Sequence, residues 1–375
     1  MKILCLYPGM DIRVNDNAHA LVYLARQGVS LCVICSKVCG LKSFTPLPDY
    51  EEMAGIPVHR LYSDFPEQAS HPTRHYDQVR DIAQRFKPDL IFCSQQFNMP
   101  IATRLKRAFD LPIVLLVEYA YDSSKLLKRK WHLGLKCLAS PVGDLYWRWL
   151  SQNTRAIVTS YVGDCQHINY LERYGTPIYY IPWCNHIPEE VAARDGTKDP
   201  GRAIYVGSLS PWKNTDEFLA TLPIILAGTR VREFVIVGPG PGVDAVRLLQ
   251  KQFGDRIRYT DSLPRIDALT LIQDSFFSYT PVKAGGWGFI GDSWGVMTPL
   301  IATHNEYELQ DKKDTLIVNR IQDIHLAIHQ LYDSPELYRQ LQEGGLDRYR
   351  RSHTAQSVGS SLLRVFESAL NHQRR

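Results

Sequence analysis

Short apolar runs of strand length alternate with amphipathic stretches of helix length through both halves of the sequence. Apolar runs without polar alternation are typical of parallel strands that are buried on both faces of a sheet. Strands that alternate with helices favour right-handed crossovers and a doubly wound α/β fold. The first half contains the predicted strands Ile3–Tyr7, Ser30–Cys35, Val58–Tyr62, Leu90–Cys93, Ile113–Val117, Ala156–Ser160 and Ile178–Pro182. The second half contains Ala203–Val206, Phe234–Val237, Ile257–Thr260, Phe276–Thr280, Leu300–Ala302 and Leu316–Val318.

A chain of 375 residues is long enough for two domains that each bury a core. The polar stretch 189–202 separates the two series of strands, so we predict domains at 1–188 and 203–355 joined by this linker. Residues 356–375 follow as a final helix. Its apolar side chains recur at helical spacing as Val358, Leu362, Phe366 and Leu370.

Composition excludes several classes of protein. A hydrophobic fraction of 45% and a net charge of +4 are ordinary for a globular protein and do not indicate nucleic-acid binding. No apolar run reaches the ~20 residues of a spanning helix, and the first residues enter a core strand, so we expect a cytoplasmic protein. Cys32 and Cys35 have the spacing of a redox pair, but their position within a strand predicts two buried thiols.

The stretch Phe276–Thr303 contains the densest functional signal. Two strand-like runs bracket a glycine-rich loop and a short segment compatible with a helix. Such a loop directs backbone N–H groups and a helix N-terminus toward one point, which suits an anionic ligand at the carboxyl end of a parallel sheet.

This stretch resembles the family-4 glycosyltransferases of the GT-B fold. The residues that carry the resemblance are Pro281, Gly286, Trp287, Gly288, Asp292, Pro299 and Ile301. The resemblance implies two doubly wound Rossmann-like domains facing a cleft, with the C-terminal helix crossing back to the first domain. It also implies transfer of a sugar from a nucleotide diphosphate sugar to a hydroxyl acceptor, with retention of configuration and without a metal or other cofactor.

The acidic residues of this family are incompletely matched. Asp292 occupies the position of the second family glutamate, which implies contact with the donor ribose. The first glutamate, expected to meet the donor sugar, falls near Ala284 or Gly285, and neither residue ionises.

A second family pattern lies in the loop Gly207–Asn214. Gly207, Leu209 and Lys213 match it, and Ser208 stands where the family has an arginine. The resemblance implies that Lys213 binds the donor diphosphate, although one bidentate phosphate contact is lost with the arginine. The alternative is a solvated lysine at the start of a helix.

Further residues line the donor side by analogy with the family. Gly238 belongs to the run Val237–Gly242, whose spacing fails the dinucleotide fingerprint because position 243 is valine. Leu263 lies in the loop that walls the base. The full predicted donor set is Gly9, Ser208, Lys213, Gly238, Leu263, Gly286, Trp287, Gly288, Phe289 and Asp292.

On the acceptor side we predict Asn17, His19 and Glu118. Asn17 is equally suited to be a plain helix N-cap, and His19 to be a surface helix residue. Glu118 follows a central strand, where a carboxylate faces a ligand site by topology, and its alternative is a cap or an ion pair. With Lys213 and Asp292 it completes the catalytic candidates. No cluster has metal-ligand spacing.

Basic residues are interleaved with leucine and tryptophan over residues 123–149. This pattern is used by helices at anionic membrane surfaces, and its alternative is a helix that packs on the sheet. The acceptor is therefore expected to be a glycan, a lipid-linked sugar or a small molecule. Two rival functions are a degenerate GT-B protein that binds nucleotide sugar without turnover and a GT-B epimerase.

Overall fold

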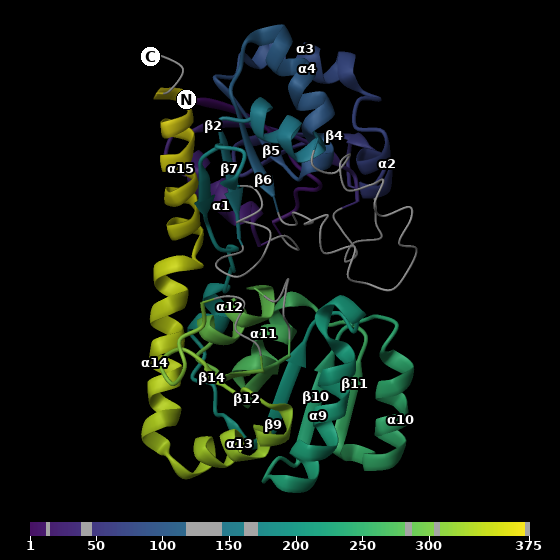
Figure 1. Cartoon of the computed structure of the whole chain (residues 1–375), viewed down its shortest axis with the longest axis vertical. Coiled ribbons are helices and arrows are strands. Elements are labelled where there is room, and N and C mark those ends of the chain that lie inside the picture. Colours follow the sequence, from purple (N-terminus) through teal and green to yellow (C-terminus); the bar gives the residue numbers. More distant parts are fainter. Residues whose placement is uncertain are drawn as a thin grey trace. The chain divides into compact units, whose positions relative to one another are not determined.

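The computed structural model describes residues 1–12, 16–38, 47–117, 145–160, 172–281, 287–303 and 308–371 (Figure 1). The chain forms two compact units. The first comprises Met1–Pro182 and Ala355–Arg375, and the second comprises Trp183–Thr354. Each contains its own sheet and its own core, as expected for two domains.

The first unit is built on an eight-stranded sheet of order β3-β4-β2-β1-β5-β6-β7-β8. All its pairings are parallel except β3 with β4. The strands are β1 (Lys2–Leu6), β2 (Ser30–Ser36), β3 (Tyr50–Met53), β4 (Ile56–Tyr62), β5 (Leu90–Ser94), β6 (Ile113–Val117), β7 (Ala156–Thr159) and β8 (Ile178–Tyr180). Every strand predicted in this half is present. The added edge strand β3 was not predicted, because its sequence YEEM lacks an apolar run.

Helices connect the strands of this unit: α1 (Ala18–Arg26), α2 (Phe65–Ser70), α3 (Tyr76–Phe86), the 3-10 turn η2 (Gln96–Asn98) and α4 (Met99–Phe109). The unit also contains the C-terminal helix α15 (Ala355–Asn371), which connects no strands. Residues 145–153 are also helical.

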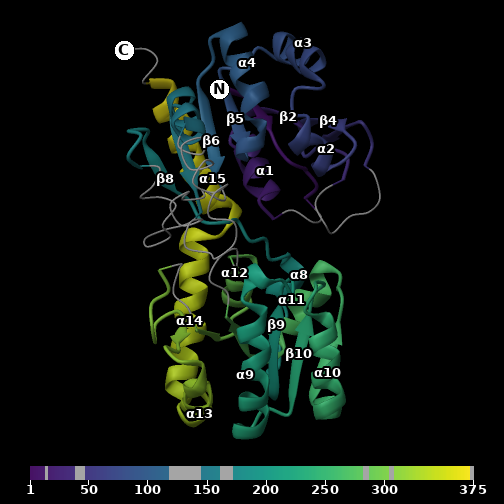
Figure 2. The ribbon, with the colours of Figure 1, turned by 45° about the vertical axis from the view of Figure 1, so that its right-hand side comes forward.

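The C-terminal helix α15 belongs to the first unit, as predicted, and it packs on α1 (Figures 1 and 2). A Cβ at Gly359 would lie 2.5 Å from the Tyr23 ring and 3.1 Å from the Ala20 carbonyl oxygen, so only glycine allows the two helices to approach this closely. Phe366 meets Phe92 of β5 edge to face, with ring centroids 5.2 Å apart.

The second unit has a six-stranded, fully parallel sheet of order β11-β10-β9-β12-β13-β14. This is the doubly wound order of a Rossmann fold, which confirms the predicted fold class. The strands are β9 (Asp199–Val206), β10 (Glu233–Val237), β11 (Ile257–Thr260), β12 (Ser275–Thr280), β13 (Leu300–Ala302) and β14 (Leu316–Ile317). The helices are α8 (Glu189–Ala192), η3 (Pro211–Lys213), α9 (Thr215–Gly228), α10 (Val243–Phe253), η4 (Gly254–Arg256), α11 (Arg265–Gln273), α12 (Trp287–Gly295), η5 (Ile321–Asp323), α13 (Ile324–Asp333) and α14 (Pro335–Ser352).

The predicted linker 189–202 contains α8 and the beginning of β9, both in the second unit. The Gln273 side-chain amide donates to the carbonyls of Val191 (3.1 Å) and Arg194 (3.3 Å), which holds this polar stretch against α11. The polar composition therefore marks a surface segment of the second unit, and the chain passes between units at Pro182–Trp183 and at Thr354–Ala355.

Cys32 and Cys35 are both buried, as predicted. Burial raises the pKa of Cys32 to about 12, so it stays protonated at neutral pH and acts as a small core side chain.

Candidate active site

The strand order of the second unit reverses direction between β9 and β12. The chain leaves β9 toward β10 on one side, and β12 leads to β13 on the other. The two adjacent strands are parallel, so the loops that follow them diverge from the same edge of the sheet. In open α/β sheets a ligand binds at such a switch point. The two segments singled out in the sequence, 207–214 and 281–292, begin here.

The two loops are joined at their base. Asn214 follows η3 in a left-handed conformation (φ 59°), and its Nδ2 donates to the Pro281 carbonyl at 3.3 Å. Thr215 donates through its hydroxyl to the Ser210 carbonyl at 2.9 Å. These bonds hold the turn that carries Lys213 beside the end of β12.

Gly238 and Gly240 brace the loop after β9. Both have positive φ (145° and 146°), and a Cβ at Gly238 would lie 2.7 Å from the Gly207 carbonyl carbon. The Leu209 amide donates to the Pro239 carbonyl at 2.7 Å, and the Gly242 amide donates to the Leu209 carbonyl at 3.0 Å. The glycines therefore permit two loop backbones to interlock, and this contact accounts for Gly238 without any ligand.

Lys213 is half-buried at the end of η3, and the removal of water around its amine lowers its pKa to about 7. The side chain is thus partly withdrawn from solvent, and its assignment to the donor diphosphate stays a prediction. Ser208, in place of the family arginine, has its hydroxyl 2.8 Å from that of Ser210. Near neutral pH the amine carries a charge that an anion at this edge would stabilise.

Helix α12 presents its predicted residues in different ways. Trp287 is 1% exposed, with its ring 4.8 Å from that of His353. Phe289 packs edge to face on Tyr205 at 5.6 Å. Both side chains belong to the core, and the assignment of these two residues to the donor site stays a prediction. Gly288 is exposed, and a Cβ there would meet nothing within 4 Å, so the helix backbone is accessible at this residue.

Asp292 is buried in α12 and is bound through both carboxylate oxygens. Arg265 at the beginning of α11 forms a forked ion pair with it: Nη1 contacts Oδ2, and Nη2 donates to Oδ1 at 2.6 Å. The amide of Asn185 donates to the same Oδ1 at 3.0 Å. The fork fixes the plane of the carboxylate. The assignment of Asp292 to the donor ribose stays a prediction.

Sequence reasoning missed Arg265 and Asn185. Arg265 lies at the end of the loop predicted to contact the donor base, but no family motif includes it. Asn185 lies outside every motif that the sequence analysis identified. A buried carboxylate needs a cationic partner, so the sequence could indicate only that Asp292, once buried, requires such a partner. Leu263 of the same loop is half-buried and packs on the core of the second unit.

In the first unit the strand order reverses between β1 and β5, and the loop after β1 is anchored there. Gln68 donates to the Tyr7 carbonyl at 2.9 Å and to the Asn98 side chain at 3.1 Å. Buried Arg60 donates to the Met10 carbonyl at 2.8 Å. These bonds give the backbone around Gly9, which is buried, a defined course at the switch point.

Asn17 and His19 begin helix α1. Asn17 occupies the N-cap position, but its side chain makes no capping hydrogen bond. The His19 Nε2 lies 2.9 Å from the Ile12 carbonyl oxygen, so the ring ties the helix to the preceding loop. Glu118 and Gly286 lie outside the described residues, as do residues 123–144 of the predicted membrane segment.

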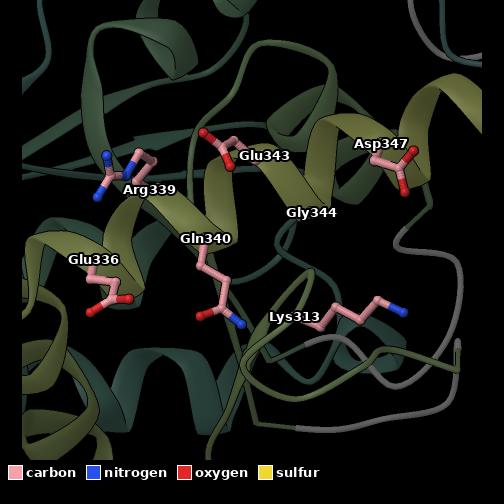
Figure 3. A pocket seen from close by; sticks show the side chains of 7 residues that line it. All are labelled: Lys313, Glu336, Arg339, Gln340, Glu343, Gly344 and Asp347. Atoms are coloured by element: carbon pink, nitrogen blue, oxygen red, sulfur yellow. The ribbon is translucent and has the colours of Figure 1, made fainter.

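The structure also contains an open pocket along α14, away from the predicted donor residues (Figure 3). Lys313 precedes β14, so this pocket lies toward the amino end of that strand rather than at the carboxyl edge. Figure 3 shows charged side chains of both signs around it. Its lining is Lys313, Glu336, Arg339, Gln340, Glu343, Gly344 and Asp347.

Among the described residues no group of three or more His, Cys, Asp or Glu side chains is arranged to hold a metal ion. Within the same residues, no helix combines the length and the apolar character that crossing a membrane requires.

Comparisons with known proteins agree with this architecture. Residues 9–162 match the family model described as a glycosyl transferase 4-like domain. The structure is similar to sucrose-phosphate synthase from Thermosynechococcus elongatus (14% identity, 99% of each chain covered, TM-score 0.73). It is also similar to the Anabaena protein HepE in complex with UDP-glucose (13% identity, 98% of this chain and 100% of that chain, TM-score 0.68).

A third similar structure is an α,α-trehalose-phosphate synthase from Burkholderia xenovorans in complex with glucose-6-phosphate (14% identity, 98% of this chain and 100% of that chain, TM-score 0.71). No curated protein matches the sequence significantly. Residues 9–162 are thus similar to a glycosyl transferase 4-like domain, and the protein shares with these structures the GT-B fold of two Rossmann-like domains.

Proposed function

We propose that the protein transfers a sugar from a nucleotide diphosphate sugar to a hydroxyl group of an acceptor. One observation carries the proposal: the Lys213 loop and helix α12 leave adjacent strands at the switch point of the second sheet. A cation and an accessible helix backbone at this edge suit a diphosphate. The complexes of HepE with UDP and with UDP-glucose make UDP the first donor nucleotide to test.

The chemistry of such a donor agrees with these residues. Negative charge develops on the diphosphate as the bond to the sugar breaks, and a fixed cation stabilises that charge. Lys213 supplies the cation, and the backbone at Gly288 lies near the beginning of α12, whose dipole favours an anion. With this stabilisation supplied by the protein, we propose a reaction that needs no metal or other cofactor. Retention of configuration is proposed from the family resemblance alone.

The acceptor is proposed to bind at the switch point of the first unit, where the loop around Gly9 leads to Asn17 and His19. Glu118, which follows β6 in the sequence, is the proposed acceptor-side carboxylate. The bound glucose-6-phosphate of the trehalose-phosphate synthase supports a sugar or sugar phosphate as the first acceptor class. Lipid-linked sugars and longer glycans form the second class.

The test is a donor screen followed by a turnover assay. UDP should raise the unfolding temperature, since a ligand at a hundred times its Kd adds about 2.7 kcal/mol of stability. The matching UDP-sugars are then incubated with sugar and sugar-phosphate acceptors, with and without EDTA. Failure of every nucleoside diphosphate to bind would refute the proposal. Donor that binds but is never transferred would favour the degenerate alternative, which the comparisons do not support.

We further propose a cytoplasmic protein that docks peripherally on the inner face of the membrane through residues 123–149. Of this segment the structure describes the end, where Leu145 is 65% exposed and Tyr146 38% exposed. Each basic residue near an anionic surface contributes about 1 kcal/mol. Flotation with anionic vesicles at low salt should recover the protein, and neutral vesicles should not. If the protein does not bind anionic vesicles, a soluble acceptor is the better interpretation.

A further inference from the structure

Asn185 clamps the first turn of helix α12. Its side-chain Nδ2 donates to the Gly288 carbonyl at 2.7 Å and to the Asp292 Oδ1 at 3.0 Å. The two acceptors lie four residues apart, on the same face of the helix. Because both neighbours only accept hydrogen bonds, the orientation of the amide is determined: a flipped amide would direct its oxygen at a carbonyl and a carboxylate.

The packing of α12 is adapted to this side chain. A Cβ at Gly291 would lie within 2.5 Å of the Asn185 Cγ and 3.0 Å from its Nδ2. No real Cβ contact is that short, so any larger residue at 291 must displace Asn185. The absence of a side chain at Gly291 therefore leaves the space on the helix surface that the Asn185 amide occupies.

The backbone of Asn185 is held where the chain passes between the units. Its amide donates to the His353 carbonyl at 2.8 Å, and its own carbonyl accepts from the Tyr349 hydroxyl at 3.1 Å. The His353 Nδ1 in turn lies 2.9 Å from the Trp183 carbonyl oxygen. His353, beside one chain passage, therefore bonds both Asn185 and Trp183, beside the other passage.

The contacts also determine which carboxylate oxygen is left for a ligand. Each carboxylate oxygen accepts about two hydrogen bonds. Oδ1 of Asp292 receives Arg265 Nη2 and Asn185 Nδ2, while Oδ2 receives Arg265 Nη1 among the described residues. The remaining acceptor position is on Oδ2.

We propose that Asn185 is a positioning residue for nucleotide donor binding: it orients Asp292 so that Oδ2 meets the donor hydroxyl, and it holds the Gly288 backbone. This inference rests on the proposed donor site. The proposal adds Asn185, which does not itself contact the donor. Asn185 connects helix α12 to the segments where the chain passes between the units.

A double-mutant cycle with UDP as the probe tests the proposal. Asn185→Ala should weaken UDP binding about tenfold or more, because Asp292 and Gly288 lose their common donor. Gly291→Ala should have a similar effect, because the new methyl group expels the amide. The double variant should bind UDP within about twofold of Asn185→Ala, because the methyl group then has an empty space to occupy.

A matched control separates positioning from folding. Gln273→Ala also removes a buried amide that donates to two backbone carbonyls in the second unit, at the opposite end of α11 from Arg265. It should lower thermal stability while leaving the Kd for UDP within about twofold of the parent. If Gln273→Ala weakens UDP binding as much as Asn185→Ala does, the role of Asn185 is only structural and the proposal is wrong.

Asn185→Asp supplies a readout that stability alone would not move. The new carboxylate faces Asp292 and donates only when protonated, so its UDP affinity should recover as the pH falls, relative to the parent. A parent-like affinity for UDP in Asn185→Ala, or strictly additive effects in the cycle, would overturn the proposal. A parent protein that binds no nucleoside diphosphate would instead refute the donor site itself.

Discussion

The lowered pKa of Lys213 predicts that donor binding depends on pH. The amine has a pKa of about 7 in the free protein, and an adjacent diphosphate stabilises its charged form and raises that pKa. Above the free pKa, binding therefore requires uptake of a proton. From the fraction of charged amine, the Kd should increase about tenfold from pH 6 to pH 8, and up to about 90-fold from pH 6 to pH 9.

The variant Lys213→Met isolates this effect, because it keeps an unbranched side chain of nearly the same length and removes the charge. The loss of a hydrogen bond to a charged group should weaken binding by about 1.5–3 kcal/mol at pH 6, and the pH dependence should disappear. UDP-glucose is the better probe, since the terminal phosphate of free UDP itself titrates with a pKa of about 6. Isothermal titration calorimetry in buffers of different ionisation enthalpy would measure both the Kd and the proton uptake.

Stability should change in the opposite direction. The folded-state pKa lies below the unfolded value of 10.5, so between about pH 7 and pH 10.5 the unfolded chain binds the extra proton. The parent therefore gains stability as the pH rises through this window and carries the full penalty of the buried charge below it. Lys213→Met should be more stable than the parent at pH 6. A parent Kd that is flat from pH 6 to pH 9, or a variant that keeps the parent profile, would refute the role of Lys213.

Three further predictions concern the second unit. Asp292→Asn should weaken UDP binding less than Lys213→Met does, since an amide keeps one acceptor. It should also lower the free energy of unfolding by about 1.5–3 kcal/mol, because Arg265 loses its anionic partner. Equal stability of variant and parent in urea titrations would contradict the ion pair. Burial lowers the pKa of His353 to about 3, so stability should fall as the pH drops below 6.5, by up to about 1.4 kcal/mol per pH unit. His353→Gln should remove this slope, and unchanged slopes would contradict the assignment. Gly238→Ala should cost more stability than Gly254→Ala: both glycines have positive φ, so each variant loses about 1–3 kcal/mol in backbone strain, and only Gly238→Ala adds a clash with Gly207. Similar melting temperatures would contradict the interlocked loops.

The sequence was sufficient for the elements and their order. Runs such as Ile113–Val117 are apolar on both faces, and only a strand between two helical layers buries them fully, so every predicted strand is present. Helix α15 was predicted from its periodicity, since Val358, Leu362 and Phe366 form one apolar stripe at helical spacing. The strand β3 escaped prediction because an edge strand pairs through backbone groups, and its side chains carry no periodic signal.

The candidate site divides in the same way. The family resemblance marked Lys213 and Asp292 without any knowledge of the tertiary structure, because the motifs that carry it are short and local in sequence. Trp287 and Phe289 lie in the same run, and only the packing of α12 shows that their side chains belong to the core.

Only the tertiary structure determined which polar side chains that lie far apart in the sequence are hydrogen-bond or ion-pair partners. Asn185 reaches Gly288 and Asp292 across more than a hundred residues of sequence, and Arg265 reaches Asp292 from the preceding helix. The apolar pattern determines which face of each element is buried, because burial depends on the periodicity of a short segment. The identity of a buried polar partner depends on which backbones meet, and that is settled only when the sheet order brings their ends together.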